Sequence, residues 1–312
     1  MQELSVFSGT AHVDLATEIC EHLDVPLHPS RLERFANDCI EVQLQANCRG
    51  RDVFLIQPLV PPVQENLVEL LMMINAAKGA SAGRITVVMP HYAYARSDKK
   101  DSPRISIGGR LVADLLAAAG AERMLMMTLH SPQVHGFFSV PVDHLHALRE
   151  LAGHFQRYDL SNAVVVSPDL GNAKSASAFA RILDVPVAAG AKQRFADDRV
   201  VISSVIGDVA GRDVIVLDDE IAKGSTVLEL LERLREVGVS SIRVACTHGL
   251  FSDGALTRLN DQADIIEIVC TNTVPLTKEK WVPKLQVLSI APAFSEAIRR
   301  IHNGESVSAL FR

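Results

Sequence analysis

Residues 214–226 read VIVLDDEIAKGST, and this stretch decides the fold class. Its first four residues, Val214–Leu217, are apolar and mostly β-branched, a pattern typical of a buried strand in a parallel sheet. Two acids, Asp218 and Asp219, follow at the predicted carboxyl end of that strand. The chain then turns through glycine and small hydroxyl residues into an apolar repeat with helical spacing. The stretch therefore predicts a strand, a polar turn and a helix, as in α/β folds.

The polar turn of this stretch suits a sugar phosphate. Ligands of open α/β sheets bind beyond the carboxyl ends of the strands. Backbone N–H groups at a helix N-terminus favour a phosphate, and carboxylates accept hydrogen bonds from sugar hydroxyls. We therefore expect Asp218 and Asp219 to bind a ribose diol, and the turn after them to bind the 5-phosphate. The candidate residues of this phosphate turn are Lys223, Gly224, Ser225 and Thr226. An ordinary strand–loop–helix junction with solvated acids is the alternative, and the Walker pattern of P-loop proteins is absent.

The alternation of strands and helices extends along the chain. Short apolar runs predict further strands at Val53–Gln57, Ile85–Met89, Ala163–Val166, Ile242–Ala245 and Ile265–Val269. Apolar residues at helical spacing predict helices at Val63–Ala77, Gly108–Ala119, Ala173–Leu183 and Thr226–Val237. These patterns predict an α/β fold with mainly parallel, doubly wound sheets flanked by helices. A polar stretch near 146–162 predicts a boundary between an N-terminal domain, 1–148, and a C-terminal domain, 149–312.

Composition narrows the class of partner. The net charge of the 312 residues is −6 and no basic tail is present, which argues against nucleic acid as the main partner. No signal peptide and no bilayer-spanning apolar run is visible, so no membrane partner is expected. The five cysteines are scattered and form no C-x-x-C pair, which indicates free thiols in a reducing cytoplasm and makes a zinc site improbable.

Two further loops carry residues suited to phosphate chemistry. In the segment 167–172, which follows a predicted strand, Gly171 allows close approach to a pyrophosphate and Asp169 suits a divalent cation. In the segment 191–194, Lys192 and Arg194 suit the clamping of a transferring phosphoryl group, and the polar surroundings predict a mobile loop. Taken alone, each of these patterns is also found in ordinary polar loops.

Two other segments carry weaker patterns. His130 ends an apolar run, and a lone histidine in such a place is more often structural than catalytic. The segment 94–100, which contains Arg96 and Asp98, suits a nucleotide-phosphate loop, although a run of charges is usually a solvated face.

Taken in order, these segments resemble the motifs of ribose-phosphate pyrophosphokinases, also called phosphoribosyl pyrophosphate synthetases. The resemblance covers essentially the whole chain. Further matching segments are 47–52, 80–86, 136–138, 165–169, 207–212, 297–301 and 305–308.

The resemblance implies a fold and a reaction. It implies two tandem type I phosphoribosyltransferase-like domains, with the nucleotide on the N-terminal side and ribose 5-phosphate on the C-terminal side. The final segment, 294–312, is expected to contain a helix that can pack back on the N-terminal domain. The implied reaction of nucleotide biosynthesis is transfer of the diphosphoryl group of ATP to the 1-hydroxyl of ribose 5-phosphate, with Mg²⁺. The resemblance also implies a homo-oligomer, a dimer or a hexamer.

The resemblance also implies roles for single residues. His130 and Asp169 match metal-linked positions near the triphosphate. Lys192 and Arg194 match cations of a flexible loop and, with His130, make up the implied catalytic set. The implied nucleotide-binding residues are Phe35, Asn37, Arg96 and Asp98.

Several positions depart from the family pattern. In the phosphate turn, Ala222 replaces an Asp, Lys223 a Thr and Ser225 a Gly, and a β-carbon at Ser225 is expected to restrict a turn that needs positive φ. Carboxylates on the nucleotide side are replaced by Asn37 and Cys39. The remaining departures are Thr128 for Asp, and Ser175 and Gln193 for Arg. They leave open an active pyrophosphokinase, a related transferase with another donor or pentose phosphate, and a catalytically weak regulatory paralogue.

Overall fold

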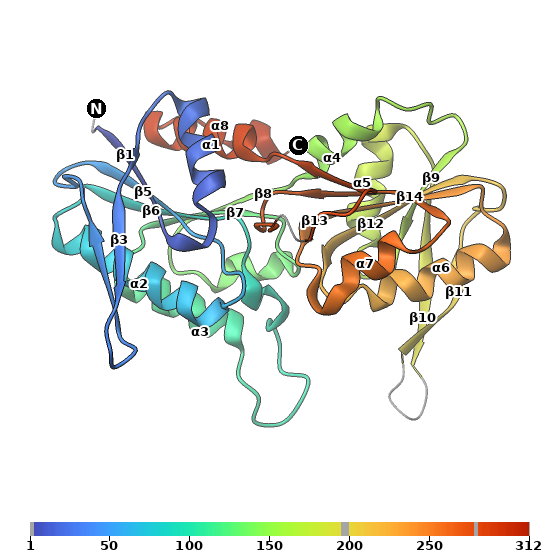
Figure 1. Cartoon of the computed structure of the whole chain (residues 1–312), viewed down its shortest axis with the longest axis horizontal. Coiled ribbons are helices and arrows are strands. Elements are labelled where there is room, and N and C mark those ends of the chain that lie inside the picture. Colours follow the sequence, from blue (N-terminus) through green and yellow to red (C-terminus); the bar gives the residue numbers. More distant parts are fainter. Residues whose placement is uncertain (1–2, 195–199, 278–279, 312) are drawn as a thin grey trace. The chain divides into compact units, whose positions relative to one another are not determined.

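The computed structural model describes residues 3–194, 200–277 and 280–311. The chain forms two compact units (Figure 1). The first comprises residues 1–146, 273–275 and 290–312, and the second comprises residues 147–272 and 276–289. The division thus falls near the polar stretch that marked it in the sequence, and the C-terminal helix belongs to the first unit.

The first unit is built on a six-stranded, fully parallel sheet in the order β2-β1-β5-β6-β7-β8. The strands are β1 (Leu4–Ser8), β2 (Leu27–His28), β5 (Asp52–Ile56), β6 (Arg84–Met89), β7 (Arg123–Met127) and β8 (Val142–Leu145). The helices are α1 (Val13–Leu23), α2 (Val63–Gly79), α3 (Gly108–Ala119) and α8 (Ala291–Asn303). Helices α1 and α8 cover one face of this sheet, and α2 and α3 cover the other (Figure 1).

A separate antiparallel hairpin joins β3 (Ser30–Arg34) to β4 (Ile40–Leu44) in this unit. Four short 3₁₀ turns complete it. They are η1 (Thr10–His12), η2 (Ala93–Arg96), η3 (Pro132–Phe137) and η6 (Ser308–Phe311).

The second unit has a seven-stranded sheet in the order β11-β10-β9-β12-β13-β14-β15, parallel except for the pair β10 and β11. The strands are β9 (Ala163–Ser167), β10 (Val187–Arg194), β11 (Val200–Ile206), β12 (Asp213–Ile221), β13 (Ser241–Gly249), β14 (Ile265–Thr271) and β15 (Leu285–Leu288). The helices are α4 (Leu148–Phe155), α5 (Ala173–Leu183), α6 (Ser225–Val237) and α7 (Ala255–Asn260), with a 3₁₀ turn η4 (Ser252–Gly254) before α7. Helices α4 and α5 pack on one face of the sheet and α6 and α7 on the other, so each face has its own core (Figure 1).

The apolar runs in the sequence predicted strands and helices at the right places. All six predicted strand runs fall on strands, with Gln57 alone lying one residue past the end of β5, and all four predicted helices are present within two residues of their expected ends. One prediction was wrong. Lys192, Gln193 and Arg194 belong to β10 and not to an irregular loop, because antiparallel pairing with β11 satisfies their backbone groups whatever their side chains are. The residues that follow this predicted mobile loop, 195–199, lie outside the described residues.

Within the described ranges, no helix combines the length and the apolar character needed to cross a bilayer.

A buried ion-pair network ties α8 to the start of the first sheet. Asp52 is 1% exposed and accepts hydrogen bonds from Arg84 Nε at 2.8 Å and Nη2 at 2.5 Å. His302, near the end of α8, contacts the same carboxylate through Nδ1 at 2.8 Å. Arg84 also donates to the backbone carbonyl of Ile301 at 3.0 Å. One carboxylate therefore joins β5, β6 and α8.

We expect Asp52→Asn to lower the free energy of unfolding by about 2–4 kcal/mol, because it removes the buried anion that the partly buried Arg84 pairs with. The matched control is Asp114→Asn on α3, which breaks an exposed pair with Arg110 at 2.9 Å and should cost less than about 0.5 kcal/mol. Urea denaturation followed by circular dichroism measures both. Equal losses in the two variants would show that the buried network does not stabilise the unit.

Candidate functional site

Three acids of the second unit lie near the carboxyl edge of the sheet, on or after neighbouring strands. Asp169 lies in the loop between β9 and α5. Asp218 and Asp219 lie in the last part of β12, which has passed its pairing with β9 at Val216 but still pairs with β13, so the strand runs on through the two acids that the sequence placed at its end. The structure thus brings together acids that lie about fifty residues apart in the sequence.

Asp169 is held by a cation and by backbone donors. Its Oδ2 accepts from Lys192 Nζ at 2.5 Å, and its Oδ1 accepts from the backbone N–H of Asn172 at 3.1 Å. Burial alone would raise the pKa of Asp169, but the Lys192 ammonium and the backbone N–H groups of Asn172 and Gly171 lower it below its usual range. Asp169 is therefore an ionised, partly buried carboxylate at neutral pH.

The approach of β10 to this loop depends on Gly190. A β-carbon at Gly190 would lie 2.5 Å from the carbonyl oxygen of Pro168, closer than any real contact. The missing side chain lets β10 pass close enough to the loop for Lys192, two residues later, to reach Asp169. Neither Gly190 nor Asn172 was among the residues predicted from the sequence, because their roles arise only from the approach of two separate segments.

Asp218 and Asp219 behave as a coupled pair. The backbone N–H of Asp219 donates to Asp218 Oδ1 at 2.9 Å. Burial, followed by the neighbouring charge of Asp219 and then that of Asp169, raises the pKa of Asp218 well above its usual range. This pair therefore gains most from a ligand that donates hydrogen bonds or adds positive charge.

The phosphate turn leads from β12 into α6. Gly224 has a φ of +71°, and Ser225 is already the first residue of α6. The expectation that Ser225 would restrict the turn was therefore wrong, since the positive φ falls one residue earlier, on a glycine. The first backbone N–H groups of α6, including those of Ser225 and Thr226, have no acceptor within the helix and therefore suit an anion.

The segment after β13 supports this turn. The guanidinium of Arg258 donates to the carbonyl oxygens of Lys223 at 2.6 Å and of Asp253 at 2.5 Å. Ser252 N–H donates to the carbonyl of Ala222 at 2.9 Å. The exposed Lys223 ammonium lies 3.4 Å from the Asp253 carboxylate, so a phosphate would share that cation with an acid of the chain.

The first unit carries the other predicted site residues. His130 is exposed and follows β7, and Arg96 and Asp98 lie at the end of η2 and just after it. Ser131 Oγ donates to Asp98 at 2.5 Å, so the histidine loop and the 94–100 segment are joined. The structure therefore brings together His130 and Asp98, whose segments looked unrelated in the sequence.

Phe35 begins the turn of the β3–β4 hairpin, and its ring is 47% exposed. The turn is closed by a bond from Phe35 N–H to the carbonyl of Cys39 at 2.8 Å, and Asn37 Oδ1 accepts from Cys39 N–H at 3.2 Å. Arg34 pairs with Asp38 of the turn at 2.5 Å and with Glu65 of α2. The Arg34 side chain thus connects the turn that carries Phe35 to the body of the unit.

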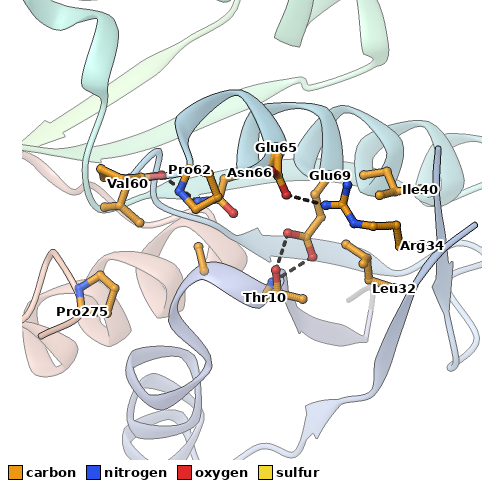
Figure 2. Close-up of a pocket in the computed structure, with 12 residues that line it drawn as sticks. Thr10, Leu32, Arg34, Ile40, Val60, Pro62, Glu65, Asn66, Glu69 and Pro275 are labelled. Atoms are coloured by element: carbon orange, nitrogen blue, oxygen red, sulfur yellow. Dashed lines mark hydrogen bonds and ion pairs between the residues drawn. The ribbon is translucent and has the colours of Figure 1, made fainter. Parts of the chain in front are cut away.

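A cavity of about 340 Å³ lies between this hairpin and α2, and Figure 2 shows its lining. Leu32 and Ile40 of the hairpin form part of its wall. Thr10 and Glu69, which are hydrogen-bonded to each other, also line it. Glu69 accepts from the backbone N–H of Thr10 at 2.8 Å and from its hydroxyl at 2.7 Å. The Glu69 carboxylate therefore already accepts hydrogen bonds from within the protein.

The predicted metal residues fall in different units, His130 in the first and Asp169 in the second. Among the residues that the structure describes, no group of three or more His, Cys, Asp or Glu side chains could hold a metal ion. Arg194 ends β10, at the edge of the described residues, and its side chain lies outside what the structure describes.

Comparisons with known proteins agree with these features. Residues 4–120 match the N-terminal domain of ribose phosphate pyrophosphokinase, and residues 196–312 match the phosphoribosyl synthetase-associated domain. A Streptomyces coelicolor protein, provisionally named a ribose-phosphate pyrophosphokinase, is 77% identical over 311 residues, with 100% of this chain and 98% of the relative covered. The ribose-phosphate pyrophosphokinase of Deinococcus radiodurans is 49% identical, with 99% and 98% covered. The crystal structure of phosphoribosylpyrophosphate synthetase from Mycobacterium smegmatis matches with a TM-score of 0.91 at 40% identity, covering 97% of this chain and 100% of that one.

We expect Lys192→Met to raise the pKa of Asp169, because burial then acts without the opposing ammonium. Carboxyl ¹³C NMR titration of the ligand-free protein measures this shift. Lys174→Met, which removes an exposed ammonium from α5, is the control and should leave the Asp169 titration where it was. An unchanged pKa in the Lys192 variant would mean that the ion pair does not form in solution.

Proposed function

This chain belongs to the ribose-phosphate pyrophosphokinase family, and from that premise we propose that it transfers the pyrophosphoryl group of ATP to the 1-hydroxyl of ribose 5-phosphate. The observation that supports this most directly is the edge of the second sheet, where paired acids stand just before a helix N-terminus. That edge offers acceptors for a diol and backbone donors for a phosphate, the two ends of a pentose phosphate.

The acceptor occupies the 218–226 segment in this proposal. The hydroxyls of the ribose donate to Asp218 and Asp219, which relieves the repulsion that raises the pKa of Asp218. The 5-phosphate accepts from the N–H groups of the α6 N-terminus, including Ser225 and Thr226. These donors belong to the backbone, so the departures at Ala222, Lys223 and Ser225 leave them in place.

The donor side uses the cations of β10. In the ligand-free chain Lys192 neutralises Asp169. We infer that the triphosphate draws Lys192 away from Asp169, and that Lys192 and Arg194 then neutralise charge on the transferring group. Phe35 stacks on the base, while Asn37, Arg96 and Asp98 contact the nucleotide.

Mg²⁺ fits the donors that are present. Mg²⁺ prefers oxygen ligands and is usually held by one or two carboxylates together with substrate phosphates, so a three-residue protein cage is not required. Asp169, an ionised carboxylate, would take that part, and His130 would be the second residue associated with the ion. When bound, Mg²⁺ neutralises phosphate charge as the bond to the leaving group breaks.

We also propose a homo-oligomer in the cytoplasm. Four apolar side chains are exposed on α2 and α3, which pack side by side: Val68 (42%), Met72 (36%), Leu111 (55%) and Leu115 (40%). Such a patch suits burial against another copy. The five cysteines are free and four of them are buried, as expected for a chain kept in a reducing compartment.

The proposed function is tested by the product formed from ribose 5-phosphate, ATP and Mg²⁺, identified by mass spectrometry. Lys192→Ala should lower kcat by about 10²–10³-fold while changing the Kd for ribose 5-phosphate less than about threefold, because its charge acts on the transferring group. Lys78→Ala, which removes an exposed lysine of α2, should leave both values unchanged.

Calorimetry measures the binding of ribose 5-phosphate separately from turnover. Asp219→Asn should weaken ribose 5-phosphate binding by about tenfold, and the exposed control Asp208→Asn should not. No heat at millimolar ribose 5-phosphate would remove the 218–226 segment from the site. Binding without turnover with any nucleotide would favour a regulatory chain instead.

The departures on the nucleotide side predict a relaxed choice of donor. Phe35 can stack on any purine, but Asn37 and Cys39 lack carboxylates to accept from an adenine amino group, and Asn37 Oδ1 is engaged by Cys39 N–H. We therefore expect the ratio of kcat/KM for ATP over GTP to rise by at least about tenfold in the double variant Asn37→Asp, Cys39→Glu. Strong rejection of GTP by the wild type, with no change in the double variant, would contradict this.

A further inference from the structure

The loop that carries His130 begins with a strained residue. Thr128, the first residue after β7, has a φ of +40°, in the left-handed region that β-branched residues avoid. Such a conformation is unfavourable and persists only where surrounding contacts impose it. The contacts that impose it here therefore also set the path of the backbone into His130.

Hydrogen bonds from three directions hold this loop. Thr128 N–H donates to the carbonyl of Leu145 at 2.8 Å, extending the pairing of β7 with β8. Leu129 N–H donates to His144 Nε2 at 2.8 Å, and Ser131 Oγ donates to Asp98 at 2.5 Å. The bond to His144 is made by Leu129, the residue directly before His130.

The role of the His144 ring is specific to its chemistry. A ring nitrogen that accepts from a backbone N–H must be unprotonated, so His144 carries its proton on Nδ1 in this arrangement. Leu129 is 5% exposed, so without His144 its N–H would have little water to replace the lost acceptor. Asp143, the preceding residue, points to the opposite face of β8 and pairs with Arg123 at 2.6 Å. His144 therefore supplies a side-chain acceptor from β8 to the loop, beside the backbone carbonyl of Leu145.

We propose that His144 is a positioning residue for His130. By accepting the Leu129 N–H, it maintains the strained turn at Thr128 and presents the exposed His130 side chain at a fixed place beyond β7. The proposal rests on the proposed function, since it takes His130 as part of the catalytic set. A structural role alone would require only that the fold survive, whereas positioning requires that kcat follow this one hydrogen bond.

Three substitutions distinguish the two roles. His144→Leu removes the acceptor. His144→Asn keeps a polar side chain but places its oxygen near the position of Nδ1, one atom short of Leu129. His144→Gln places an oxygen near the position of Nε2 and should restore the bond. His146→Gln is the matched control, because the His146 ring lies beside that of His144, with centroids 4.4 Å apart, while the acceptor of the Leu129 N–H is His144.

We expect His144→Leu and His144→Asn to lower kcat by about 10–100-fold, with the KM for ribose 5-phosphate changed less than about twofold. His144→Gln should retain kcat within about threefold of the wild type, and the control should match it. Hydrogen exchange resolved at the Leu129 amide, measured without substrates, should become about tenfold faster in the Leu and Asn variants only.

Each other outcome has a definite meaning. Faster exchange at Leu129 with full kcat, lost kcat with unchanged exchange, or a Gln variant as defective as the Leu variant would each overturn the proposal. If the Leu variant does not fold, the Asn and Gln variants decide between the two roles. If the wild type makes no product with any nucleotide, the proposed function fails, and the exchange rates alone decide whether His144 holds the loop.

Discussion

The second unit depends on how the charge of its acids is balanced. Asp169 follows β9, while Asp218 and Asp219 lie near the end of the neighbouring β12, where burial and then the charges of Asp219 and Asp169 raise the pKa of Asp218. One acid has its own cation, since Lys192 pairs with Asp169 and lowers its pKa. Within the coupled pair, Asp218 accepts a hydrogen bond from the backbone N–H of Asp219. The edge of the sheet therefore presents a coupled pair of acids that favours hydrogen-bond donors, beside an acid that already has its own cation.

The elements of this fold that could be predicted from the sequence are those whose pattern lies within a short stretch of residues. The run before Asp218 and the helical repeat after Thr226 are local, so the strand, the turn and the helix followed from the residues themselves. Strand β10 was not predicted, because Lys192–Arg194 is polar and extended only through its pairing with β11. The hairpin β3–β4 was missed for a related reason: its residues alternate between half-buried and exposed without an apolar run.

The candidate site shows the same limit. The resemblance pointed to His130, Asp169 and Lys192, but no pattern pointed to the residues that hold them. Gly190 matters only because β10 passes the Pro168 carbonyl, and His144 only because β8 lies beside the end of β7. Both depend on contacts between segments that are distant in the sequence. A single sequence does not show such contacts. A strand followed by two acids and a glycine turn, in contrast, can be recognised from its own residues.

Backbone strain gathers where strands of both units end. Thr128 follows β7 with a φ of +40°, Gly224 follows β12 with a φ of +71°, and Phe251 follows β13 with a φ of +46°. Each position redirects the chain within two or three residues, and each is tied to another segment by a bond from a backbone group: Thr128 N–H to Leu145, the Lys223 carbonyl to Arg258, and Phe251 N–H to Ile221. An unstrained chain would continue the strand and carry its side chains away from the sheet edge. The positive φ, strained at Thr128 and Phe251 and without strain on Gly224, thus turns the chain at the ends of these strands, and the long-range hydrogen bonds keep the two strained residues in place.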